Sequence, residues 1–198
     1  LGLRIYFGDN TDYARFQIIK RFSETCGGVE MEFRLAVMQD LEQLKYIYEE
    51  IIRNMNEKGI QIWDDIYPCE FFENDIKNNQ LYILENNGEL ISAFVLCDRS
   101  PGENAVEWKD KHAKAMYLDR LGVNIKYSKM GIGSSMITKA KEIARTLGAE
   151  YLRLFVVDIN EPAIRLYEKN YFFKVKGIYN EVFDDGFVLH EFGYETKV

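Results

Sequence analysis

The stretch from residue 115 to residue 172 contains an order of elements that limits the folds open to this chain. A strand-like run, Ala115–Val123, leads through a short connection to Gly131-Ile132-Gly133 at the head of an amphipathic segment. Apolar residues recur in that segment at spacings of three and four as far as Leu147, and a glycine follows, which predicts a helix. A second apolar strand and a second helical segment come next. The sequence therefore predicts an α/β arrangement with a glycine loop at a helix N-terminus.

The glycine loop has the properties of an anion-binding site. The first N–H groups of a helix have no partner within the helix, the helix dipole favours negative charge there, and glycine leaves room for a phosphate. Ser134 follows Gly133 where a Walker loop would need lysine, and Met136 stands where a dinucleotide fingerprint would need a third glycine. These differences count against both of those phosphate loops. We expect the main-chain cradle to run through the residues Lys129, Met130, Gly131, Ile132, Gly133 and Ser134.

Two motifs in register resemble those of the GCN5-related N-acetyltransferase (GNAT) family. Leu121-Gly122-Val123 followed by Gly131-Ile132-Gly133 resembles the acetyl-CoA signature, and Asn160-x-x-Ala163-x-x-Leu166-Tyr167-Glu168-Lys169 is similar to the next motif. The resemblance covers roughly residues 31 to 195. It implies an α/β (α+β) fold, with a mixed, mostly antiparallel twisted sheet of about seven strands flanked by helices. The chain departs from the pattern at Ser128, where the family prefers Gln or Arg, and at Tyr171, where glycine is common.

The resemblance also implies roles for individual residues. It makes acetyl-CoA the co-substrate, without a metal, and places these residues around it: Leu121, Gly122, Val123, Lys129, Met130, Gly131, Ile132, Gly133, Ser134, Asn160 and Ala163. The Val123 N–H would face the thioester oxygen, and Tyr167 would protonate the coenzyme A sulfur. Asn160 would bind the pantetheine arm or cap its helix. Each role has a structural alternative, because Tyr167 also has the spacing of a core residue and Val123 that of a buried strand residue.

The acceptor side is less defined by the sequence. An amine acceptor arrives protonated, so a base must take its proton, and Asp119 on the central strand is a candidate. The alternatives are a surface ion pair with Arg120 or a chain of water molecules. Tyr117 on the same strand, together with Trp63 and Tyr67 in the connection after the first helix, would line the acceptor side or would pin that connection to the core.

Two classes of function remain open at this stage. One is an N-acetyltransferase that transfers the acetyl group to a primary amine of a small molecule or peptide by direct attack in a ternary complex, since no cysteine lies near the motifs to carry the acetyl group. The other is a non-catalytic acyl-CoA-binding sensor or partner module.

Composition narrows the partners and the compartment. The chain has 198 residues, a formal net charge of −7 and a pI near 5.0, so we expect neither nucleic acid nor membrane as a partner. No apolar run has the length of a membrane span, and no signal peptide is visible. Cys26, Cys69 and Cys97 are odd in number and lack a metal-ligand spacing, which favours a reducing cytoplasm.

The remaining segments predict one domain with an extension. We expect helices over 40–58 and 69–79, a hairpin of 81–85 with 90–97, and a terminal antiparallel pair of 173–179 with 187–194. The GNAT-like domain would run from 31 to 198. Residues 1–30 contain a strand-like run near Leu3 to Phe7 and helical tendencies from Tyr13 to Phe22. They would be a mis-set start, a fusion remnant or an interface segment, the last of which would make a homodimer.

Overall fold

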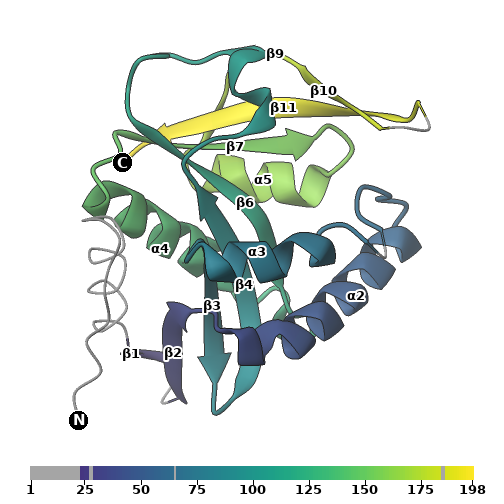
Figure 1. Cartoon of the computed structure of the whole chain (residues 1–198), viewed down its shortest axis with the longest axis vertical. Helices are drawn as coiled ribbons and strands as arrows, with labels where there is room; N and C mark the ends of the chain where they lie inside the picture. Colours follow the sequence, from purple (N-terminus) through teal and green to yellow (C-terminus); the bar gives the residue numbers. More distant parts are fainter. Residues whose placement is uncertain (1–22, 27–28, 65, 184–185) are drawn as a thin grey trace.

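The structure, a computed structural model, describes residues 23–26, 29–64, 66–183 and 186–198 (Figure 1). Nine strands form one twisted sheet in the order β1-β2-β3-β4-β6-β7-β11-β10, with β8 paired to β11, and β5 and β9 form a separate pair. All pairs in the main sheet are antiparallel except that of β6 with β7. The strands are β1 (Ser23–Cys26), β2 (Val29–Leu35), β3 (Leu81–Asn86), β4 (Glu89–Cys97), β5 (Val106–Glu107), β6 (Ala115–Val123), β7 (Tyr151–Val157), β8 (Phe173–Lys174), β9 (Lys176–Gly177), β10 (Tyr179–Val182) and β11 (Val188–Lys197).

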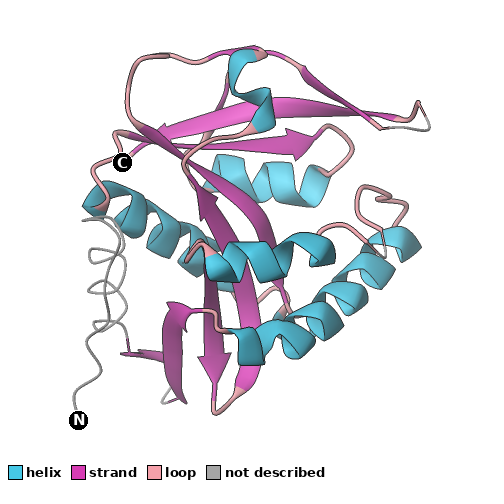
Figure 2. Ribbon diagram, viewed as in Figure 1, coloured by secondary structure: helices cyan, strands magenta, loops and turns pink. Residues whose placement is uncertain are grey.

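Helices cover both faces of this sheet (Figure 2). On one side, which we call the α2/α3 face, lie α2 (Leu41–Glu57) and α3 (Phe72–Lys77). On the other, the α4/α5 face, lie α4 (Ile132–Thr146) and α5 (Glu161–Lys169). Strand β4 shows how the two cores divide, because Ala93 and Val95 pack with α2 and α3 whereas Phe94 and Leu96 pack with α4.

The predicted helices are present. Leu44, Ile47, Tyr48 and Ile51 are buried on α2, which begins after a short 3₁₀ turn, Met38–Asp40. The predicted helix 69–79 consists of a 3₁₀ turn, Cys69–Phe71, followed by α3. On α4 all the apolar positions that the periodicity placed inside are buried: Ile132, Met136, Ala140, Ile143 and Ala144 in the helix, and Leu147 at its C-cap. The mixed, mostly antiparallel sheet is confirmed as well.

Two details of the sheet differ from the sequence prediction. The sheet has more strands than about seven, in part because β1, from the N-terminal extension, pairs with β2. The predicted strand 173–179 is broken into β8, β9 and the start of β10. The break at Gly177 has a steric reason: φ is +101°, and a Cβ there would lie 2.9 Å from the Ala105 carbonyl oxygen. The chain bends away at this glycine and pairs with β5 instead. The predicted elements before residue 23 lie outside the described residues.

Strands β6 and β7 separate partway along their length. They are paired only at Ala115–Tyr151, Met116–Leu152 and Tyr117–Arg153, although both strands are fully described. On its other side β6 continues to pair with β4 as far as Val123, across a bulge between Asp119 and Gly122. Arg120, at this bulge, has a left-handed φ of +50°. We call the unpaired part of these two strands the β6/β7 split.

No helix in the described part of the chain is both long and apolar enough to cross a lipid bilayer.

Candidate active site

The glycine loop leads into the N-terminus of α4 with backbone geometry suited to an anion. Lys129 and Gly131 have left-handed φ angles of +63° and +83°, and Gly131 is the N-cap residue. The Ser135 N–H makes a hydrogen bond of 3.1 Å to the Gly131 carbonyl, so the amides ahead of it form the open first turn. A Cβ on Gly131 would meet nothing within 4 Å, and Lys129, Met130 and Gly131 are exposed. This loop is accessible to a phosphate group.

Gly133 also has a packing role, and its predicted place in the main-chain cradle stays a prediction. A Cβ at this position would lie 3.0 Å from a methyl group of Leu166 on α5. The absence of a side chain at Gly133 therefore allows α4 and α5 to approach each other. Ser134, the next residue, is also tied to α5, because its Oγ accepts a hydrogen bond of 3.0 Å from Asn170 Nδ2.

A cavity of about 340 Å³ lies beside the loop. Its walls come from the second half of α2, from the end of β6 and from the loop itself, and they consist of Ile51, Asn54, Met55, Lys58, Val123, Ile125, Ser128 and Lys129. Two predicted residues, Val123 and Lys129, are thus brought to one cavity. The α2 residues in its wall were not predicted as site residues, because the helical periodicity assigns Ile51 and Met55 to the apolar face of the helix and gives Asn54 and Lys58 no distinguishing signal.

Asn160 and Ala163 form the N-terminus of α5. The Asn160 side-chain oxygen accepts a hydrogen bond of 3.3 Å from the Ala163 N–H, and Pro162 lies in the first turn. Asn160 is therefore a helix cap, which is one of its two expected roles. Capping occupies the side-chain oxygen, so the side-chain NH2 group is the part of Asn160 that could donate a hydrogen bond to a ligand.

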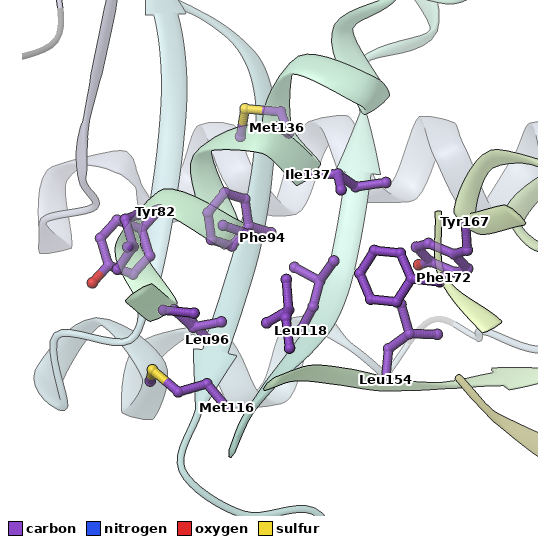
Figure 3. Packing of buried hydrophobic residues seen from close by; sticks show 14 of the residues in the cluster. Tyr82, Phe94, Leu96, Met116, Leu118, Met136, Ile137, Leu154, Tyr167 and Phe172 are labelled. Atoms are coloured by element: carbon purple, nitrogen blue, oxygen red, sulfur yellow. The ribbon is translucent and has the colours of Figure 1, made fainter. Parts of the chain in front are cut away.

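Tyr167 projects from α5 into the main core, where its ring meets Phe172 edge-on at 5.8 Å between centroids (Figure 3). Only 9% of the residue is exposed. Burial raises the pKa of Tyr167 well above its usual value, and the negative charge of Asp119 raises it further. The phenol therefore keeps its proton at neutral pH.

Leu121, Gly122 and Val123 form the end of β6 along the split. Gly122 is pressed against α2, because a Cβ there would lie 2.7 Å from the ring of Tyr48. The Tyr48 hydroxyl donates a hydrogen bond to the carbonyl of Arg120 at the bulge. Helix α2 thus holds the bulge in place, and with it the direction in which the following amides point.

Asp119 and Arg120 belong to an ionic network in which Arg120 and Asp75 are buried, whereas 44% of the Asp119 side chain is exposed. Arg120 Nη1 lies 2.9 Å from Asp119 Oδ2, and Nη2 lies 3.1 Å from Asp75 Oδ1 on α3. The Arg120 N–H donates to the second oxygen of Asp119 at 2.7 Å, and the guanidinium lies over the ring of Phe71. The expected ion pair is present, but its arginine is buried rather than on the surface. Both oxygens of Asp119 are therefore already bonded.

Two of the three aromatic acceptor candidates lie together, since the rings of Trp63 and Tyr67 meet edge-on at 6.4 Å between centroids, whereas Tyr117 packs elsewhere. Trp63 stacks on Tyr48 at 5.7 Å between centroids, which fastens the connection to the core. Tyr67 reaches the ionic network: burial raises its pKa, as does the charge of Asp119, while a hydrogen bond from Arg120 opposes them. Tyr117 is buried beside Trp108 at 6.1 Å, at the last paired position of β6. Of the three, Tyr67 is brought to Asp119.

Two further carboxylates, Glu181 and Glu191, lie on the same face as Asp119, and sequence reasoning missed both. Asp119 pairs with Val95, which lies on the α2/α3 face. Glu191 on β11 pairs with Val157 on β7, and Val157 lies on this face because its neighbour Val156 packs in the core of the other. Glu181 is the diagonal neighbour of Glu191 across β10.

Negatively charged groups surround these two carboxylates. Burial raises the pKa of Glu191 to about 8, and the charges of Glu181 and Asp119 contribute in the same direction. Burial and Asp119 likewise raise the pKa of Glu181. No local sequence signal marks either residue, because their proximity depends on the register of the terminal hairpin.

Among the described residues, no group of three or more His, Cys, Asp or Glu side chains is arranged to hold a metal ion.

The fold and the split define a class of proteins, the GNAT fold. An acetyltransferase of the GNAT family from Listeria monocytogenes 4b F2365 superposes with a TM-score of 0.67 at 22% identity, covering 88% of this chain and 99% of that one. The protein yncA from Salmonella typhimurium, solved with its cofactor acetyl-CoA, superposes with a TM-score of 0.59 at 16% identity, covering 84% and 93% of the two chains.

Sequence comparison identifies the family. The model of the acetyltransferase (GNAT) family matches residues 40–172, so the chain belongs to this family of acetyltransferases. A relative in Bacillus subtilis (strain 168), YwnH, named provisionally as a phosphinothricin acetyltransferase, is 27% identical over 149 residues, which are 72% of this chain and 83% of YwnH.

Proposed function

We propose that this protein transfers the acetyl group of acetyl-CoA to a primary amine of a small molecule or peptide by direct attack within a ternary complex. The observation that carries the proposal is the β6/β7 split, which opens the sheet between the predicted acid, Tyr167, and the carboxylates of the α2/α3 face. A thioester in the split would be reached by an amine from that face. Membership of the GNAT family supports this order of events.

The residues at the glycine loop fit acetyl-CoA. The exposed turn with two left-handed residues and the open first turn of α4 would bind the diphosphate through main-chain N–H groups. The pantetheine arm would run past Asn160 and Ala163 into the split. The complex of yncA with acetyl-CoA supports the same ligand for this chain.

At the reacting end, two groups would stabilise the transition state. The Val123 N–H would face the thioester oxygen as negative charge develops there, and the Tyr167 hydroxyl would give its proton to the departing sulfur. On the acceptor side, Asp119 would attract the ammonium group by its charge, with Tyr67 near it and Trp63 against Tyr67, while Tyr117 would line the same side two residues earlier on β6. Burial raises the pKa of Cys69 to about 11 and that of Cys97 to about 12, so neither of these two thiols is activated as a nucleophile, which supports direct attack over an acetyl-cysteine intermediate.

The test is amine-dependent thiol release from acetyl-CoA over a panel of primary amines that includes polyamines, aminoglycosides, amino acids and lysine peptides. Turnover with at least one amine supports the proposal. Stoichiometric binding of coenzyme A in calorimetry, without release of thiol by any amine, would instead identify a non-catalytic acyl-CoA sensor. No binding at millimolar coenzyme A would contradict both.

A further inference from the structure

The acceptor proton needs a base, and the structure weakens the candidate that the sequence suggested. Both oxygens of Asp119 are engaged by Arg120, one by the guanidinium at 2.9 Å and one by the main-chain N–H at 2.7 Å. Because both oxygens of Asp119 already accept hydrogen bonds from Arg120, we assign Asp119 to attracting the ammonium group by its charge and look for the proton acceptor among the other carboxylates of this face.

Glu191 and Glu181 have the opposite surroundings. They lie on the α2/α3 face, on the far side of β7 from Asp119, and are neighbours across β10 and β11. The charges that act on Glu191 come from Glu181 and Asp119, and both are negative. On β10 the other titratable neighbour is Tyr179, and on β7 the paired residue, Val157, is neutral. Arg120 is committed to Asp119 and Asp75.

We infer that Glu191, held beside Glu181 on the α2/α3 face, is the general base that takes the proton from the acceptor ammonium. The inference rests on the proposed acetyl transfer and names a residue for one of its steps. Glu181 is a positioning residue that acts through Glu191, because its like charge makes the Glu191 carboxylate a stronger base.

The protons of the reaction balance as follows. One of the three ammonium protons moves to the Glu191 carboxylate and from there to solvent, which leaves a neutral amine. The nitrogen lone pair forms the C–N bond, and the C–S bond breaks with its electron pair remaining on sulfur. Tyr167 gives its proton to the thiolate. The second ammonium proton leaves the nitrogen after the C–N bond forms and returns a proton to Tyr167 through solvent. The third proton stays on the nitrogen of the amide product. A base with a pKa near 8 can both accept a proton and release it near neutral pH.

The test is the pH dependence of kcat/KM between pH 5.5 and 9.5, with an amine whose own pKa is above 10. We expect the wild type to rise through an apparent pKa near 8. Glu191→Gln should show no such rise, and its kcat/KM at pH 8 should be about 10²-fold lower than that of the wild type. Glu181→Gln should move the rise to lower pH, because the repelling charge is gone. Glu150→Gln, at an exposed position at the other end of β7, is the matched control and should keep the wild-type profile.

Two further measurements make every outcome decisive. Calorimetry with coenzyme A checks that each variant is folded. If Glu191→Gln does not fold, the assignment of Glu191 as the base is decided by whether the pH profile shifts in Glu181→Gln. Carbon-13 NMR of labelled glutamate carboxyls should show one group that titrates near pH 8 in the wild type and is missing in Glu191→Gln. An unaltered pH rise in Glu191→Gln, an unshifted rise in Glu181→Gln, or no carboxyl titrating above pH 6.5 would each overturn the assignment while leaving acetyl transfer intact. A wild type that acetylates no amine would overturn the proposed function and the base together.

Discussion

Tyr167 is a core residue for which we also propose a chemical role. The sequence allowed either a core residue or an acid, and the structure shows that the ring belongs to the core, where it contacts Phe172. Burial and the negative charge of Asp119 both raise the pKa of this hydroxyl. The same burial that fixes the ring keeps the phenol protonated, which a proton donor requires. Its role as the acid stays a prediction.

Removal of the Tyr167 hydroxyl tests that role. We expect Tyr167→Phe to lower kcat by about 10²-fold, because the thiolate would then leave without a positioned acid. Coenzyme A affinity should change by less than about threefold, since the ring and its packing remain. The measurement is steady-state kinetics together with calorimetry. Tyr151→Phe is the matched control, because Tyr151 is equally buried, at 9% exposure, but lies at the paired end of β7. An unchanged kcat in Tyr167→Phe would remove the hydroxyl from the mechanism.

At the scale of elements, the central strand β6 is shaped by the helices around it. The bulge at Arg120 is held from α2 by the Tyr48 hydroxyl and from α3 by Asp75. Its left-handed φ of +50° is unusual for a residue other than glycine, and these contacts offset the strain. The sheet remains continuous on the β4 side while it separates from β7. Strand β6 thus presents the edge along which a thioester would lie.

Helix α5 allows the two expected roles of Asn160 to be separated. Asn160→Asp keeps the oxygen that caps the helix but removes the amide donor, whereas Asn160→Ala removes both. We expect Asn160→Ala to lower the free energy of unfolding by about 0.5–2 kcal/mol and Asn160→Asp to change it little, because aspartate caps equally well. If the amide binds the pantetheine arm, Asn160→Asp should weaken coenzyme A binding by about 2- to 10-fold, the value of one hydrogen bond.

Urea denaturation and calorimetry on both variants provide the measurements for Asn160. Full coenzyme A affinity in Asn160→Asp would show that the residue is a cap alone. Equal stability of Asn160→Ala and the wild type would contradict the capping role.

At the scale of the whole molecule, the sheet separates two layers with different chemistry. The α4/α5 face carries the main apolar core, Tyr167 and the open end of α4, whereas the α2/α3 face carries the ionic network and the extra carboxylates beyond it. The β6/β7 split joins the two layers. The cofactor and the acceptor would therefore approach the reacting carbon from opposite sides of the sheet.

The raised pKa of Glu191 should also affect how the free energy of unfolding depends on pH. Its pKa is about 8 in the folded state, against an ordinary value of 4.5, so the folded chain holds a proton that the unfolded chain has released between those values. Through this group, the free energy of unfolding should fall as pH rises from about 5 to 8, by up to roughly 1.4 kcal/mol per pH unit. Urea denaturation at pH 5, 6, 7 and 8 measures this slope. Glu191→Gln should lack this contribution, whereas Glu150→Gln should retain it, and equal slopes in Glu191→Gln and the wild type would contradict the raised pKa.

The sequence by itself determined the elements whose information is local. Helices α2 and α4 follow from apolar residues that recur at the helical period, and the glycine loop and the Asn160 cap follow from residues only a few positions apart. The two motifs in register also identified the family, since their spacing is a property of the chain alone. The division of the terminal strand was missed, because the bend at Gly177 depends on its contact with Ala105, more than seventy residues away.

Only the tertiary structure decided which charged groups face each other. Arg120 meets Asp75 across 45 positions of sequence, and Glu191 is placed diagonally to Glu181 by the register of β10 with β11. Strand register and bulges are set by the packing of whole faces, and a shift of one residue would turn each of these side chains to the opposite side of the sheet. The strands that carry the proposed chemistry could therefore be predicted from the sequence, whereas the partners that tune each carboxylate could not.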